Sequence, residues 1–117
     1  MSKKWKPKEL YLFLNSRYFR GRLPDIPVVW SAKRHNGREN RNMGATIFQR
    51  GKDGVLRPTK IVLNPQYKNA FVIWAGTLLH EMVHVQQWKL PREQAHGRKF
   101  QKRIKQLVAV GAYNGLL

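Results

Sequence analysis

A histidine, a glutamate and a second histidine stand inside the most apolar stretch of the chain with the spacing H-E-x-x-H, at His80, Glu81 and His84. Residues four apart lie on the same face of an α-helix, so both imidazoles can bind one metal ion. Glu81 lies about 100° round the helix from His80, where its carboxylate can reach a water at that metal without being a ligand. Two nitrogen donors and a carboxylate that accepts a proton are what zinc-dependent hydrolysis requires.

The alternative interpretation of the same motif is a core helix in which the two histidines hydrogen-bond to backbone carbonyls. The metal site is the favoured interpretation, because a carboxylate and two imidazoles are costly in an apolar segment unless they have a partner. The chain contains no cysteine. Any zinc must therefore be held by nitrogen and oxygen donors.

A tetrahedral zinc with one position open to water needs a third protein ligand, and His96 is the candidate. Pro91 is expected to end the metal-binding helix near Lys89, and a new helix is expected to begin at about Glu93. In that helix His96 would lie four residues before Phe100, at the start of the face that packs on the core. Glu93, almost one turn earlier on the same face, is the competing ligand.

The sequence around these residues resembles a known family. The run Leu78-Leu79-His80-Glu81-Met82-Val83-His84, followed by His96-Gly97-x-x-Phe100, is similar to the SprT-like zinc metalloprotease domain, the family that includes Spartan. The resemblance extends from about Leu10 to Leu107. It implies that His80, His84 and His96 bind one Zn²⁺, that Glu81 is the catalytic base, and that the substrate is a protein bound or crosslinked to DNA. Many relatives carry a cysteine-rich zinc ribbon or other modules after this core, so here those binding functions would lie in the core itself or be absent.

The expected activity is that of a zinc metalloendopeptidase, with Glu81 taking the proton of the attacking water and passing it to the leaving amine. Histidine donors with an open position make zinc the default over manganese or cobalt. Two other classes of function stay open. One is a basic nucleic-acid-binding module with a structural or inactive zinc site, although structural zinc usually has four protein ligands and prefers cysteine. The other is a peptidase with no DNA role, whose charge only aids solubility.

The second informative feature is charge: 23 lysines and arginines stand against 6 acids, for a net charge of +17. Such an excess indicates a polyanionic partner such as DNA, bound through its phosphates without base readout, unless the surface is simply basic. The expected contacts are Lys33, Arg34, Arg98, Lys99, Lys102, Arg103 and Lys105. Among the aromatic residues, Trp5 is expected to be exposed and able to stack on bases, and the core is the interpretation for Tyr18, Trp30, Phe48 and Trp88.

The elements that must position the site add up to one α+β domain over residues 1–117, with a zincin-like core and residues 1–8 as a basic, flexible arm. A helix is predicted from Lys8 to about Arg20, since Pro7 suits its first turn and Gly21 its end. The metal-binding helix and the C-terminal helix complete the helical part.

A small three-stranded sheet is predicted between these helices. Its strands are expected at Val28–Ser31, Met43 to about Gln49 and Thr59–Leu63, with a hairpin connection at 50–54. Residues 33–42 are predicted to form a polar loop, which makes its histidine, His35, a solvated loop residue. Gly44–Gln49 is predicted to be the edge strand along which an extended substrate lies.

The sequence carries no signal-peptide pattern, and its apolar run at 71–79 is too short to span a bilayer. The hydrophobic content of 42% is typical of a folded globular protein. We therefore expect a cytoplasmic monomer that associates with nucleic acid and with no membrane.

Overall fold

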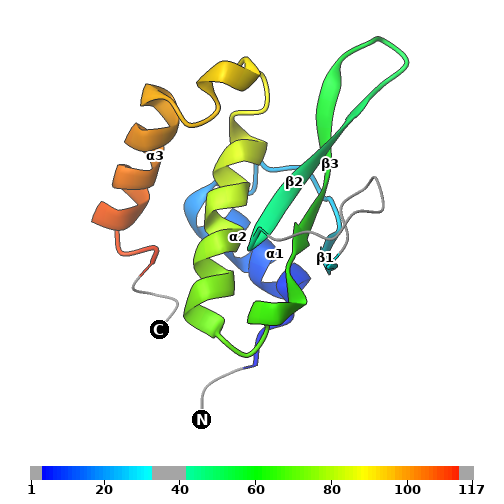
Figure 1. The fold of residues 1–117 in the computed structure, drawn as a ribbon. Coiled ribbons are helices and arrows are strands. Elements are labelled where there is room, and N and C mark those ends of the chain that lie inside the picture. Colours follow the sequence, from blue (N-terminus) through cyan, green and yellow to red (C-terminus); the bar gives the residue numbers. More distant parts are fainter. Residues whose placement is uncertain (1–3, 33–41, 114–117) are drawn as a thin grey trace.

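The computed structural model, which describes residues 4–32 and 42–113, contains three α-helices and a three-stranded sheet in that part of the chain (Figure 1). The expected α+β class is confirmed. The elements are α1 (Pro7–Tyr18), β1 (Val28–Trp30), β2 (Gly44–Arg50), β3 (Leu56–Leu63), the 3-10 turn η1 (Pro65–Tyr67), α2 (Phe71–Gln86), the 3-10 turn η2 (Arg92–Gln94) and α3 (Arg98–Ala109). Lys33, Arg34 and His35 lie outside the described residues.

Helix α1 begins with Pro7, whose fixed φ and missing N–H suit the first helical position. The helix ends at Tyr18, earlier than predicted, because Arg20 and Gly21 take the left-handed φ values of 56° and 69°. The backbone N–H of Gly21 then donates to the Asn15 carbonyl at 2.9 Å. This is a usual way to satisfy the last carbonyls of a helix.

The side chain of Asn15 holds the segment that follows α1 in place through two hydrogen bonds to the backbone of Leu23. Its amide donates to the Leu23 carbonyl at 3.2 Å and accepts from the Leu23 N–H at 3.1 Å, in a buried position.

We expect Asn15→Leu to lower the free energy of unfolding by about 2 kcal/mol, because both backbone groups lose their partner away from water. Urea denaturation measures this. The exposed Ser16→Ala should change stability by less than about 0.5 kcal/mol, and equal values for the two variants would contradict the prediction.

The sheet has the strand order β1-β3-β2, with β1 parallel and β2 antiparallel to the central β3. Strand β3 begins at Leu56 instead of the predicted Thr59, because pairing with β2 continues past Pro58. The register shift between Ile47 and Phe48 accommodates that proline, which has no N–H to donate to the ladder. Among the described strands β2 pairs with β3 alone, so it is an edge strand, as predicted.

Helix α2 lies at the centre of the fold and contacts α1, α3, β2 and β3 (Figure 1). It is apolar on most of its sides, as expected for a helix surrounded by other elements, and Leu78, Leu79 and Met82 are fully buried. Trp5 also packs against this core and lies 5.2 Å from Phe13 between ring centroids, so the expectation that it is exposed was wrong. No helix in the described ranges is both long and apolar enough to cross a bilayer.

Candidate metal centre

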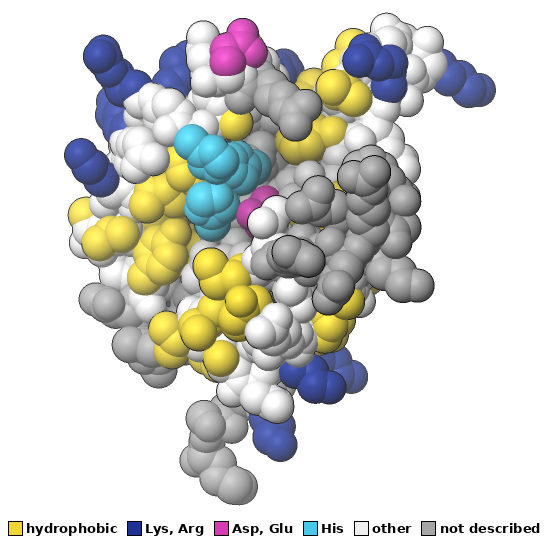
Figure 2. All heavy atoms as spheres, viewed as in Figure 1, with side chains coloured by type: hydrophobic (Ala, Val, Ile, Leu, Met, Phe, Trp, Pro, Cys, Tyr) yellow, Lys and Arg dark blue, Asp and Glu magenta, His cyan; other side chains and the backbone are white. Residues whose placement is uncertain are grey.

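Three imidazole rings meet on one side of α2. The Nε2 atom of His84 lies 3.2 Å from Nε2 of His80 and 3.0 Å from Nε2 of His96. The candidate ligand atoms of all three residues lie within 4.8 Å of one another. Figure 2 shows the histidine side chains gathered at the surface, with apolar side chains beside them and an acidic side chain in the adjoining hollow. The residues predicted as ligands are therefore brought together.

The spacing of the rings fits a zinc ion. Two nitrogens that each lie about 2.0–2.1 Å from a tetrahedral zinc are about 3.3 Å apart. The separations of 3.2 Å and 3.0 Å from His84 Nε2 to its neighbours are close to that value. Three nitrogen donors would leave one position for water, which is the pattern of catalytic rather than structural zinc sites.

His80 and His84 owe their alignment to the helical repeat, whereas His96 arrives by a different local structure from the one predicted. Helix α2 ends at Gln86 and the turn η2 follows, so His96 lies before α3 and not in the first turn of a helix that begins at Glu93. Gly97 is extended and forms the N-cap of α3. A Cβ atom at Gly97 would lie only 3.2 Å from the Gln94 carbonyl oxygen, so the close turn that presents His96 favours glycine.

The ring of Phe100 packs against all three imidazole rings. Its ring centroid lies 4.9 Å from that of His80, 4.7 Å from His84 and 5.1 Å from His96, and its ring is stacked on His84. Phe100 is itself buried. An aromatic platform of this kind restricts the imidazoles to the orientations in which their Nε2 atoms converge.

The environment of the two helical histidines favours their neutral form. Burial, and then the neighbouring His96 ring, lowers the pKa of His80. Burial, followed by the rings of His80 and His96, lowers the pKa of His84 to about 4. A neutral imidazole has the free lone pair that a metal ligand needs, so burial favours metal binding at neutral pH.

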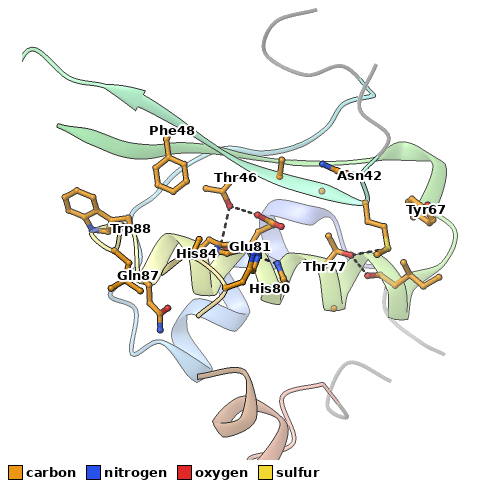
Figure 3. A pocket seen from close by; sticks show the side chains of 18 of the residues that line it. Asn42, Thr46, Phe48, Tyr67, Thr77, His80, Glu81, His84, Gln87 and Trp88 are labelled. Atoms are coloured by element: carbon orange, nitrogen blue, oxygen red, sulfur yellow. Dashed lines mark hydrogen bonds between the residues drawn. The ribbon is translucent and has the colours of Figure 1, made fainter. Parts of the chain in front are cut away.

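Glu81 is buried beside the histidines and makes its contacts with the edge strand. The Thr46 hydroxyl lies 2.8 Å from Glu81 Oε1 and 3.3 Å from the Glu81 carbonyl oxygen (Figure 3). Burial raises the pKa of Glu81, and the hydrogen bond from Thr46 opposes part of that rise. Nothing in the sequence singles out Thr46, except that strand alternation places it on the same face as Gly44 and Phe48.

An open cleft of about 1300 Å³ contains this centre and runs between α2 and β2. It includes Phe48 and Trp88, which were predicted to be core residues; Phe48 is 37% exposed and Trp88 is half-buried. Phe48 lies on the edge strand β2, and Trp88 lies just after the end of α2. Both side chains therefore line the cleft and are not enclosed by the core. Further apolar side chains line the cleft and are exposed: Met43, Leu56, Val72 and Ile73.

The basic residues of α3 do not all face solvent. Arg98, Lys99, Lys102 and Lys105 are exposed. Arg103 is half-buried and donates to the Tyr18 carbonyl and to the Gln86 side chain, so it joins α3 to α1 and α2. Arg103 therefore has a structural role, and the DNA contact expected of it stays a prediction.

Comparison with known protein families finds a match to this chain. The model of the SprT-like family matches residues 8–115. No curated protein matches the chain. No solved structure matches it either.

Proposed function

The chain belongs to the SprT-like family, and on that basis we propose that it is a zinc-dependent metalloendopeptidase. The observation that carries the proposal is the convergence of three imidazole nitrogens within 4.8 Å beside the buried carboxylate of Glu81. His80, His84 and His96 would hold the ion. Zinc bound there would activate a water molecule and polarise the scissile carbonyl.

In this proposal Glu81 is the general base. Its carboxylate accepts the proton of the attacking water and passes it to the nitrogen of the leaving amine. Glu81 is adjacent to His80 in the sequence and lines the same cleft as the three histidines. Because the residue is only 7% exposed, bulk water has little access to compete for the proton.

The proposed substrate is an extended polypeptide paired with β2. Gly44, Ala45, Thr46 and Phe48 of this edge strand all line the cleft. Backbone pairing to a strand edge provides affinity without a strict sequence requirement. The direct test is cleavage of a fluorescent protein such as labelled casein, which a chelator should stop. The absence of cleavage by zinc-loaded protein would reject the proposal.

We further propose that the substrates are proteins bound or crosslinked to DNA. The support is the net charge of +17 and the exposed Arg98, Lys99, Lys102 and Lys105 on α3, the helix that follows His96. Phosphate attraction of this kind would hold the DNA-bound substrate near the cleft. The alternative is a nucleic-acid-binding module with a structural zinc, which would bind DNA without cleaving any protein.

We expect binding to a DNA oligonucleotide to weaken about 100-fold between about 50 and about 200 mM salt, as for a few phosphate contacts. Lys99→Gln/Lys102→Gln should weaken binding at low salt and reduce the slope of log affinity against log salt by about two. Fluorescence anisotropy measures both quantities. The control variant Lys52→Gln/Lys68→Gln removes the same charge from exposed positions elsewhere. Equal losses in the two variants would contradict a binding face on α3.

A further inference from the structure

The strand that lines the cleft also holds the proposed base. We propose that Thr46 is a positioning residue that orients the Glu81 carboxylate toward the metal centre, an inference that rests on the proposed peptidase function. Thr46 Oγ1 lies 2.8 Å from Glu81 Oε1, and the two residues are 35 positions apart in the sequence. Figure 3 shows the hydroxyl of β2 facing the carboxylate of α2.

The direction of this hydrogen bond follows from its partners. An ionised carboxylate and a backbone carbonyl only accept hydrogen bonds, so the Thr46 hydroxyl is the donor. Its one hydrogen serves the carboxylate at 2.8 Å better than the Glu81 carbonyl at 3.3 Å. With Oε1 held in this way, Oε2 remains as the oxygen that can accept a proton.

A fixed carboxylate matters because a glutamate on a helix has several rotamers available. Turning the side chain away from the metal centre would remove the base from hydrogen-bond reach of the attacking water. A hydrogen bond to a charged group is about twice as strong as one between neutral groups. One bond from a rigid strand therefore favours the rotamer that faces the cleft.

The backbone places Thr46 at the required distance. Gly44, two residues earlier, packs so closely on α2 that a Cβ atom would lie 2.7 Å from Thr77 Cγ2. Thr77 is four residues before Glu81, about 6 Å along the helix, and Gly44 is two residues before Thr46, about 7 Å along the strand. The spacing of Gly44 and Thr46 along β2 thus matches the spacing of Thr77 and Glu81 along α2. The close packing of Gly44 on Thr77 brings β2 near enough to α2 for Thr46 to reach Glu81.

The other threonines of the chain lack this contact. The Thr59 hydroxyl donates to the Ile47 carbonyl at 3.3 Å, and the Thr77 hydroxyl donates to the Ile73 carbonyl within its own helix at 2.8 Å. Thr59 makes a matched control because its hydroxyl bonds within the β2–β3 pair and does not reach Glu81.

The test compares Thr46→Val, Thr46→Ser and Thr59→Val in cleavage of a fluorescent peptide by zinc-loaded protein. Valine keeps the shape of threonine and removes the hydroxyl, so we expect Thr46→Val to lower kcat about 10-fold with KM nearly unchanged. Zinc content should stay at one ion per chain. Serine keeps the donor and should restore most of kcat, and Thr59→Val should leave kcat unchanged.

Three results would overturn the inference: equal kcat for Thr46→Val and the wild type, equal losses for Thr46→Val and Thr59→Val, or no rescue by serine. A wild type without any peptidase activity would instead reject the proposed function. The contact is then judged by thermal unfolding of Thr46→Val, Glu81→Ala and the double variant. Non-additive shifts in Tm are expected, and additive shifts would show that the two side chains are not coupled.

Discussion

Glu81→Gln is expected to lower the rate of peptide cleavage by about 100- to 10,000-fold while one zinc ion stays bound, because the contribution of a general base is lost. Glutamine has nearly the shape of glutamate, and its carbonyl oxygen can still accept the hydrogen bond from Thr46. An amide has no appreciable basicity, however, so the proton of the attacking water has no acceptor. The measurement is kcat with a fluorescent substrate, together with the zinc content of the same sample.

The control for this variant is Glu9→Gln, which removes the same charge from an exposed position on α1 and should leave kcat unchanged. Unchanged turnover in Glu81→Gln would remove the general-base assignment. Loss of zinc together with activity would show instead that Glu81 shapes the metal centre. An intact metal centre with an inactive enzyme is the outcome that separates a base from a structural residue.

The part of the site that the sequence predicts well is the part that one helix determines. His80 and His84 face the same way because the α-helical repeat requires it, whatever the rest of the chain does. His96 was also placed near them, because Pro91 forces the chain to turn after α2. These predictions needed only local rules, and the positions of the three rings agree with them.

The remaining features depend on contacts between distant segments. Helix α3 begins at Arg98 because the chain turns tightly at Gly97, and no periodic pattern marks that turn in advance. Strand β3 extends across Pro58 because its partner β2 shifts register there. Thr46 acquires its contact only when β2 packs on α2, so its position beside Glu81 is a tertiary property. The class of fold and the clustering of the three histidines were predictable, whereas the residues that line and support the cleft were not.

His96→Ala is expected to weaken zinc binding by more than about 100-fold, because even the loss of a residue that only supports a zinc ligand can cost 10- to 100-fold. His96 is the exposed member of the three histidines and comes from outside α2. The two remaining imidazoles cannot retain the ion against a moderate chelator. Zinc content after dialysis, and the affinity measured by competition with a chromogenic chelator, report the loss. Cleavage should fall with the metal content.

Glu93→Gln is the matched comparison, because Glu93 is the other residue that the sequence offered as third ligand. The candidate metal ligands grouped in the described structure are His80, His84 and His96, and Glu93 is not among them. Glu93→Gln should therefore keep one zinc ion per chain and full activity. If Glu93→Gln lost zinc and His96→Ala kept it, the turn around Gly97 would have to rearrange when the metal binds, since only then could a carboxylate three residues earlier replace the imidazole. If instead His96→Ala lost zinc and Glu93→Gln kept it, the three imidazole rings would already be in position before the metal binds.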